Sequence, residues 1–342
     1  MRVLVSRTDR IGDVVLTLPL CALLREKLGA EVIALSQEYC RPVFEACPHV
    51  SEVVEWDGVE KRGRAQRDLL ARCHADVILH VYPRMAIANA ALAARIPLRI
   101  GTSHRWYHWA TCNELEHYSR KRSNLHEAQL NIRLARRLLG DIAPSAQSLS
   151  CLTTLQPRAS LPSEVEGLLD PSVTTVVLHP GSGGSGREWP LDRWHDLAWS
   201  LVGESFQLLI SGSETERLAL EPWLATLPPH AVDLMGRLDL AQLIALLARV
   251  DGIVAASTGP LHLAAALGRH ALGLYPPTPP MHAGRWAPLG PRAEYLSIND
   301  PCDAHVLSGS PLEIGCECMR GITVHDVKAR VLLWRRAVSV ER

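Results

Sequence analysis

The sequence predicts an α/β protein with two parallel-sheet domains, and three observations support this. Short β-branched and aliphatic runs alternate with helical patterns over almost the whole chain, which is typical of βαβ units. The chain has 342 residues, more than a single hydrophobic core usually holds. A segment rich in Pro, Ser and Thr, 141–172, interrupts the alternation. We therefore expect an N-terminal domain over 1–165 and a C-terminal domain over 166–342.

The N-terminal elements follow from the apolar runs and the periodic segments between them. The predicted strands are 3–6, 32–35, 53–55, 77–80 and 99–101. The predicted helices are 13–28, 64–74, 87–94 and 125–139. Gly29 stands where a glycine commonly ends a helix.

The alternation restarts after the interrupting segment. The predicted strands are 175–179, 207–211, 252–255 and 271–275, and the predicted helices are 191–202, 214–226, 240–249 and 260–267. A last helix, 324–338, is expected to pack on either domain, including back on the N-terminal one. Because ligands of parallel α/β folds bind at the carboxyl ends of the strands, we expect the functional loops directly after strands, at a central cleft.

Charge and composition narrow the function. Thirty-six basic residues balance thirty-six acidic ones, which argues against a nucleic-acid-binding protein. The nine cysteines come without a secretion signal, so reduced thiols are expected. Cys302, Cys316 and Cys318 lack the spacing of a zinc site, and free thiols are favoured there over a metal, which stays open.

The loop after the first strand, SRTDRIGD, places Asp13 at the start of a helix. A carboxylate there is stabilised in its ionised form by the helix dipole. An ionised carboxylate at a cleft can act as a general base, whereas simple helix capping is the competing interpretation.

Two loops of the second half are typical of phosphate binding. In HPGSGGSGREWP, the glycines 181, 183 and 186 match GxGxxG, but Pro190 predicts a helix start near 189, which is too late for a dinucleotide fold. The remaining loop is expected to offer free backbone N–H groups beside Arg187, which suits a diphosphate, and a mobile surface loop without a ligand is the competing interpretation. STGPLH, at 257–262, places two hydroxyls and a glycine before a helix, and capping competes with anion binding there.

Five motifs stand in one order over the chain: RTDRIGDVVLTLPL, HPGSG with REWP, SGSETER, the segment around Gly236, and STGPLHLAAALG. Together they resemble glycosyltransferase family 9, the ADP-heptose:lipopolysaccharide heptosyltransferases. The resemblance implies the GT-B fold, with two Rossmann-like domains facing a central cleft. It also implies metal-independent transfer with inversion at the anomeric carbon and no cofactor. The absence of any Asp-x-Asp sequence agrees with that expectation.

The resemblance also implies roles for individual residues. Asp13 matches the family's proposed general base. The implied donor-binding residues are Ser182, Arg187, Glu216 (ribose), Leu238 (adenine), Ser257, Thr258 and Gly259. Gly183 and His262, in the same two loops, are also expected to bind the donor, although a buried histidine without a ligand is an equal interpretation of His262. Two departures weaken the assignment of heptose: well-known members carry Asp where this chain has Ser257, and often Lys in place of Arg187.

The acceptor is expected to meet basic residues of the first domain. The candidates are Lys61, Arg62 and Arg64 in one cluster and Arg120 in another, and a solvated charged surface is the competing interpretation. The expected partners are ADP-heptose and a glycan or lipopolysaccharide-core acceptor, without nucleic acid. A different nucleotide sugar or a non-lipopolysaccharide acceptor is the alternative, and an NAD-dependent oxidoreductase and a silent binding protein are more distant ones.

The same chain is expected in the cytoplasm. Its N-terminal apolar run is too short for a signal peptide, and no apolar stretch approaches the ~20 residues of a membrane helix. A peripheral contact with the cytoplasmic face of the inner membrane stays open.

Overall fold

The structure is a computed structural model that describes residues 1–57, 63–120, 123–184, 186–298 and 317–336. Contacts divide the chain into two units, Met1–Arg158 and Ala159–Arg342. The division lies inside the Pro-, Ser- and Thr-rich segment, which also holds two short helices, α9 (Ala146–Ser150) and α10 (Ser163–Glu166).

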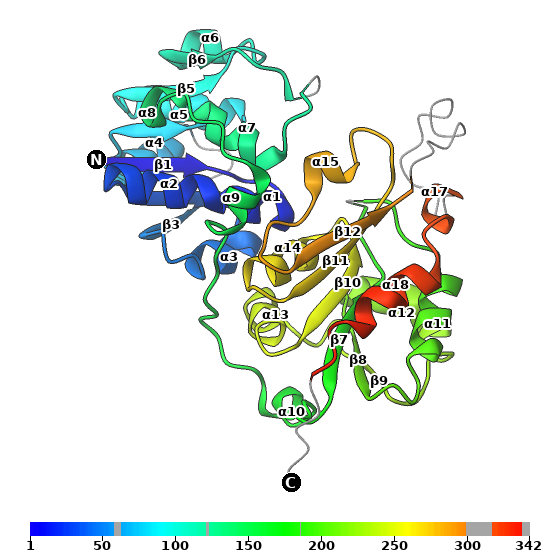
Figure 1. The fold of residues 1–342 in the computed structure, drawn as a ribbon. Coiled ribbons are helices and arrows are strands. Elements are labelled where there is room, and N and C mark those ends of the chain that lie inside the picture. Colours follow the sequence, from blue (N-terminus) through cyan, green and yellow to red (C-terminus); the bar gives the residue numbers. More distant parts are fainter. Residues whose placement is uncertain (58–62, 121–122, 185, 299–316, 337–342) are drawn as a thin grey trace. The chain divides into compact units, whose positions relative to one another are not determined.

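The N-terminal unit is built on a parallel sheet with the strand order β3-β2-β1-β4-β5-β6 (Figure 1). Its strands are β1 (Arg2–Ser6), β2 (Glu31–Ser36), β3 (Glu52–Glu55), β4 (Val77–Leu79), β5 (Leu98–Thr102) and β6 (Glu114–Glu116). Its other elements are α1 (Ile11–Val15), α2 (Leu18–Leu28), the 3-10 helix η1 (Glu38–Cys40), α3 (Arg41–Glu45), α4 (Gly63–Arg72), α5 (Met85–Ala93), α6 (His108–Thr111), α7 (Glu127–Leu134) and α8 (Arg136–Leu139).

The first helix differs from its prediction. The single helix expected over 13–28 is wrong, because the chain forms α1 and α2 with a break at Leu16 and Thr17. Pro19 occupies the first turn of α2, where its missing N–H costs nothing, whereas inside one long helix it would remove a hydrogen bond. Gly29 ends α2 with φ 58°, which confirms its predicted position.

The C-terminal unit repeats the same topology, with the order β12-β11-β10-β7-β8-β9. Its strands are β7 (Thr174–His179), β8 (Phe206–Ile210), β9 (Ala231–Asp233), β10 (Gly252–Ala256), β11 (His270–Tyr275) and β12 (Ala293–Ser297). Its helices beyond α10 are α11 (Leu191–Ser200), α12 (Glu214–Leu224), α13 (Leu240–Leu247), α14 (Gly259–Ala266), α15 (Ala283–Trp286), α17 (Glu317–Arg320) and α18 (Val324–Leu332).

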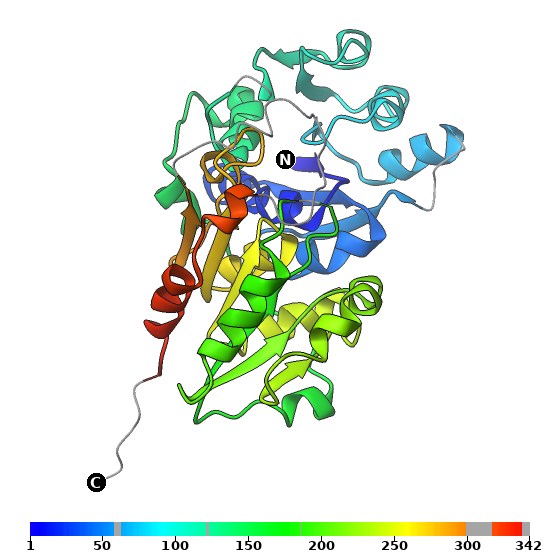
Figure 2. The ribbon, with the colours of Figure 1, turned by 90° about the vertical axis from the view of Figure 1, so that its right-hand side faces the viewer.

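The last helix belongs to the core of this second unit. Val327, Val331 and Trp334 are buried in the same apolar cluster as Trp189 and Trp194. Figures 1 and 2 show α18, in red, running beside the sheet and α11. The described part of the predicted 324–338 helix therefore packs on the C-terminal sheet.

Both sheets have the 3-2-1-4-5-6 strand order of dinucleotide-binding domains, read within each unit. In such a sheet the order in which successive strands are added reverses between the two central strands, and ligands bind outside the carboxyl ends of those strands. The loops expected at a ligand site therefore follow β1 and β4 in the first unit and β7 and β10 in the second.

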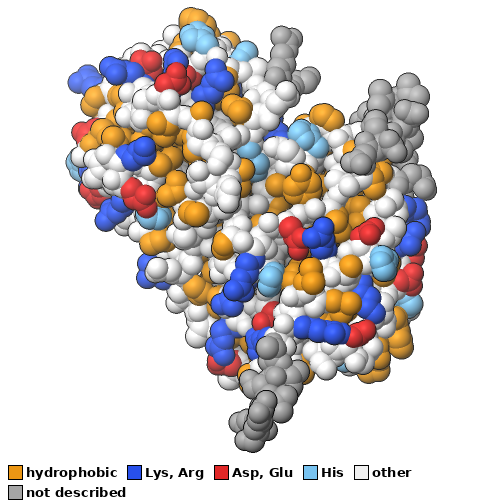
Figure 3. Space-filling view, viewed as in Figure 1, with side chains coloured by type: hydrophobic (Ala, Val, Ile, Leu, Met, Phe, Trp, Pro, Cys, Tyr) orange, Lys and Arg blue, Asp and Glu red, His pale blue; other side chains and the backbone are white. Residues whose placement is uncertain are grey.

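Two further features are the hydropathy of the helices and the distribution of charge on the surface. None of the described helices is both long enough and apolar enough to cross a membrane. On the face shown in Figure 3, Lys and Arg side chains are interspersed with Asp and Glu side chains over the C-terminal unit.

Candidate active site

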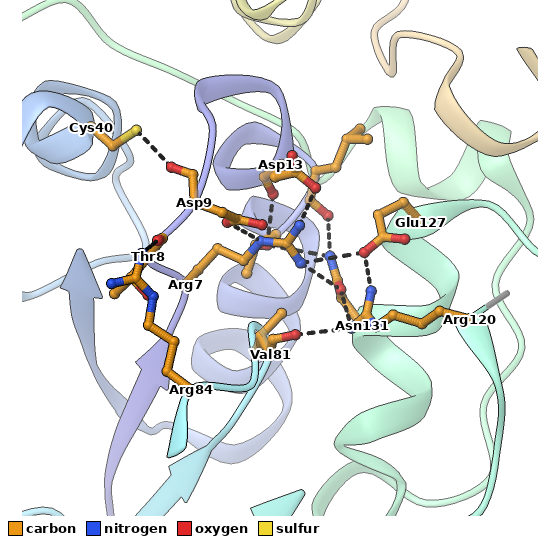
Figure 4. Close-up of polar contacts among 12 residues, drawn as sticks. Arg7, Thr8, Asp9, Asp13, Cys40, Val81, Arg84, Arg120, Glu127 and Asn131 are labelled. Atoms are coloured by element: carbon orange, nitrogen blue, oxygen red, sulfur yellow. Dashed lines mark hydrogen bonds and ion pairs between the residues drawn. The ribbon is translucent and has the colours of Figure 1, made fainter. Parts of the chain in front are cut away.

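A buried arginine organises the loop after β1. The Arg7 side chain is 2% exposed, and its Nε donates to Asp9 Oδ1 at 2.7 Å. One terminal nitrogen pairs with Asp13 Oδ1 and the other with Glu127 Oε1 at 3.3 Å. Figure 4 shows the guanidinium between these three carboxylates. Arg7 therefore fixes one oxygen of Asp13.

Helix α7 holds Arg7 from the other side. Glu127 and Asn131 lie four residues apart, so they project from the same face of α7. Asn131 Oδ1 accepts from Arg7 at 3.4 Å, while its Nδ2 donates to the carbonyl of Leu16 at 3.0 Å. The short helix α1 is thereby tied to α7 just beyond Asp13.

Arg120 is the second cation of this cluster. It pairs with Glu127 and donates to Asn131 Oδ1 at 3.0 Å and to the Val81 carbonyl, after β4, at 3.1 Å. Its side chain is 22% exposed. Arg120 was predicted to bind the acceptor, and here it belongs to the polar network behind Asp13 (Figure 4).

Asp13 does not cap the helix. The N-cap position of α1 is Arg10, and no side chain caps this helix. Asp13 Oδ2 accepts no hydrogen bond from any described residue, and the side chain is 19% exposed. One oxygen is thus held and the other is available, which is the arrangement a general base requires.

The charges of this cluster shift two pKa values. Burial lowers the pKa of Arg7, but the charges of Asp9 and Asp13 outweigh it and raise that pKa overall. Burial also raises the pKa of Asp9, from 3.8 to about 6, although Arg7 opposes the shift. Arg7 therefore stays charged, while Asp9 titrates near neutrality.

The glycine-rich loop after β7 is ordered by two carboxylates. Glu188 Oε1 accepts from the Ser182 amide and hydroxyl, both at 2.8 Å, and Glu216 Oε1 accepts from the Gly183 amide at 3.2 Å. The Gly184 amide donates to Ser182 Oγ at 3.2 Å. The expectation of free amides is therefore wrong at these three residues. The amides nevertheless point at anionic or hydroxyl oxygens, as a phosphate site requires.

Glu216 links this loop to helix α12. Its Oε2 accepts from the Ser213 amide at 2.8 Å, completing a capping box at the start of α12. Burial raises the pKa of Glu216, but the Ser213 hydrogen bonds and the charge of His179 outweigh it and lower that pKa overall. A Cβ on Gly181 would lie 2.2 Å from Glu216 Oε1, so the two residues are in close contact.

The loop after β10 meets the glycine-rich loop. A Cβ on Gly186 would lie 3.1 Å from the Ser257 carbonyl oxygen and 3.3 Å from Ser257 Cβ. Thr258 is the N-cap residue of α14, yet its hydroxyl caps nothing and is buried without a partner among the described residues. Arg187 is 7% exposed and His262, on α14, is 3% exposed. The structure thus brings both predicted phosphate loops together within the second unit.

The remaining predicted residues are more scattered. Leu238 is half-buried just before α13, Gly259 begins α14, and Arg64 is exposed on α4. Lys61 and Arg62 lie outside the described residues, as do Cys302 and Cys316, whereas Cys318 is buried. Within the described part of the chain, no three His, Cys, Asp or Glu side chains are grouped to hold a metal ion.

Sequence reasoning missed the residues that organise both loops. Arg7, Glu127 and Asn131 fix Asp13, and Glu188 fixes Ser182. One signal was present: Glu127 and Asn131 stand at i and i+4 in a helix whose neighbouring positions are apolar, where paired polar side chains usually have buried partners.

Two Rossmann-like units, each with polar loops at the switch point of a parallel sheet, define an α/β protein with the GT-B fold. Residues 64–313 match glycosyltransferase family 9 (heptosyltransferase), and the chain belongs to this family. It is therefore a glycosyltransferase.

Individual relatives agree with this membership. Lipooligosaccharide heptosyltransferase 2 of Haemophilus ducreyi is 23% identical over 322 residues, covering 88% of this chain and 89% of the relative. The Escherichia coli ADP-heptose lipopolysaccharide heptosyltransferase II structure is similar with a TM-score of 0.74, at 23% identity and 98% coverage of both chains. An Escherichia coli heptosyltransferase with ADP has a TM-score of 0.68 at 17% identity, covering 98% of this chain and 100% of that one.

Proposed function

We propose that the protein transfers a heptose from ADP-heptose to a hydroxyl of a lipopolysaccharide core or a related glycan, with inversion and without a metal ion. The observation that carries the proposal is the Asp13 carboxylate, held by Arg7 through one oxygen and open at the other. Family membership supplies the reaction class, and the relatives' names supply the donor and acceptor.

In the proposed reaction Asp13 takes the proton of the acceptor hydroxyl while that oxygen attacks C1 of the donor sugar. The bond from C1 to the diphosphate breaks on the opposite face, so the configuration inverts. Asp13 needs no movement to begin, because Arg7 already holds it.

The leaving ADP acquires negative charge that must be stabilised. Arg187, the amides of the glycine-rich loop and the loop at 257–259 are the groups proposed for this task. Glu216 would exchange its bond to the Gly183 amide for one to the ribose, which frees that amide for a phosphate oxygen. With these groups supplying the charge, turnover should persist when EDTA removes divalent cations; complete loss that added Mg²⁺ restores would contradict metal independence.

The donor can be tested directly. Calorimetry with ADP-heptose, UDP-sugars and GDP-sugars should show binding of ADP-heptose at least about tenfold tighter than of the others. Arg187→Ala should weaken that binding, whereas the exposed Arg249→Ala should not, because among the described residues the Arg249 side chain forms an ion pair with Glu166 at the surface. Preference for UDP- or GDP-sugars would favour the alternative donor that Ser257 raises.

The acceptor and the location are proposed together. We also propose that the enzyme works in the cytoplasm, in peripheral contact with the inner membrane, and that exposed Arg64 is among the residues that meet the acceptor. Arg64→Ala should raise KM for a phosphorylated acceptor without changing kcat, and an equal KM would remove Arg64 from this role.

A further inference from the structure

Two tryptophans of the N-terminal unit extend into solvent. Trp106 is 76% exposed and Trp109 is 63% exposed. They lie three residues apart on the helical turn that enters α6, with the Trp109 amide 3.2 Å from the Trp106 carbonyl, so both rings emerge from one side of that turn. The indole N–H of Trp109 donates to Ser103 O at 3.0 Å, which fixes its ring. Two neighbouring tryptophans with such large exposed fractions indicate an interaction surface.

More apolar side chains continue this surface onto α5. Tyr82, Met85 and Leu92 are 37%, 48% and 42% exposed. Helices α5 and α6 pack against each other. In Figure 3 hydrophobic side chains reach the surface in the upper part of this unit, among His, Lys, Arg, Asp and Glu side chains. We name this region, from Tyr82 to Trp109, the α5–α6 surface.

The charge of the α5–α6 surface has one sign. From 77 to 113 the chain contains no Asp or Glu, but it contains Arg84, Arg95, Arg99 and Arg105. Arg95 and Arg105 are exposed, and the Arg84 guanidinium lies over the Tyr82 ring, 5.6 Å from its centroid.

The acidic side chains of neighbouring elements do not cancel this charge. On β6 and α4 each is already next to an arginine: Glu114 with Arg137 (3.9 Å), Glu116 with Arg136 (3.4 Å) and Asp68 with Arg67 (2.6 Å). The surface as a whole is therefore apolar and basic.

We propose that the α5–α6 surface docks on an anionic phospholipid bilayer. Tryptophan favours the boundary between headgroups and acyl chains because its ring is apolar and its N–H is polar. Arginines beside it gain from the negative potential of anionic lipids. The inference needs neither donor nor acceptor, so it stands or falls separately from the proposed reaction.

Vesicle flotation of the full chain tests the proposal. The protein should float with vesicles of phosphatidylglycerol and phosphatidylcholine, remain free with phosphatidylcholine alone, and dissociate as salt is raised. The double variant Trp106→Ser, Trp109→Ser should bind anionic vesicles at least about tenfold more weakly, because it loses the apolar area that enters the bilayer. Trp199→Ser is the matched control, since Trp199 on α11 is also 46% exposed but lies outside the surface.

The single variant Trp106→Ser controls for misfolding. The Trp106 indole makes no hydrogen bond to any described residue, so the urea transition of this variant should match that of the wild type. Equal vesicle binding by the double variant and the wild type would overturn the proposal, as would no binding of the wild type to anionic vesicles. Unchanged vesicle binding together with weaker binding of a soluble phosphorylated glycan would also overturn it, and would make the surface a sugar platform.

Discussion

Replacing Arg7 with methionine tests the electrostatic design around Asp13. The change keeps most of the side-chain stem but removes the guanidinium. The Arg7 side chain is only 2% exposed, and its guanidinium contacts three carboxylates. Asp9, Asp13 and Glu127 would then face a single guanidinium, that of Arg120. Uncompensated charge of this kind costs about 3–5 kcal/mol of stability.

The effect on catalysis is separable from the effect on stability. Without Arg7, the Asp13 carboxylate loses the contact that fixes it, and a shift of about 1 Å is enough to lower kcat about 100-fold. KM for the donor should change little, because the loops proposed to bind the donor belong to the C-terminal unit. Arg7→Lys should recover part of kcat, since it restores the charge but not the planar fork.

Steady-state kinetics and urea unfolding of both variants measure these effects. Arg41→Met is the matched control: Arg41 also contacts two carboxylates, Glu45 and Glu55, but its side chain is 45% exposed, so it should cost no more than about 1 kcal/mol and leave kcat intact. A folded Arg7→Met enzyme with kcat within about twofold of the wild type would refute the positioning role.

Three further predictions follow from the same contacts. The pKa of Asp9 is raised from 3.8 to about 6 in the folded protein, so between these pH values the folded protein keeps a proton that the unfolded chain has released. The unfolding free energy of the wild type, measured relative to Asp9→Asn, should therefore fall by about 3 kcal/mol as pH rises through this range. Parallel curves of stability against pH for the two proteins would contradict this prediction. Gly186→Val should push the loop away from Ser257 and weaken donor binding at least about tenfold, whereas Gly63→Val, at an open position, should not; equal donor affinity in calorimetry would contradict the loop contact. Glu216→Gln can keep the capping box but loses the charge and one accepted hydrogen bond, so ADP affinity should drop about fivefold and the free energy of unfolding by about 1 kcal/mol; unchanged affinity would remove Glu216 from the ribose site.

The central strands of both sheets could be predicted because they are buried on both faces. Strands β1, β7 and β10 are almost wholly buried and read as continuous apolar runs. The edge strands β6, β9 and β12 were missed, since they are short or half-exposed, and charged residues such as Glu114 and Asp233 interrupt the apolar pattern.

Some positions of the candidate site could likewise be predicted from the sequence, and others could not. Loop positions such as Asp13 and Ser257 were recognisable because they follow strands, where parallel sheets bind ligands. The partners of Arg7 on α7 lie 120 and 124 residues away in sequence, so only the tertiary structure brings them together. The Gly183 amide was expected to be free, but local reasoning did not include the carboxylate of Glu216 from the next helix.

Heptose transfer by Asp13→Asn, measured against the wild type with ADP-heptose and a lipopolysaccharide-core acceptor, tests the account most directly. Asparagine keeps the shape and a carbonyl oxygen for Arg7 but cannot accept the proton, so kcat should fall at least about 100-fold while donor affinity stays within about twofold. Near-normal turnover by a folded, donor-binding Asp13→Asn enzyme would show that another group removes the proton.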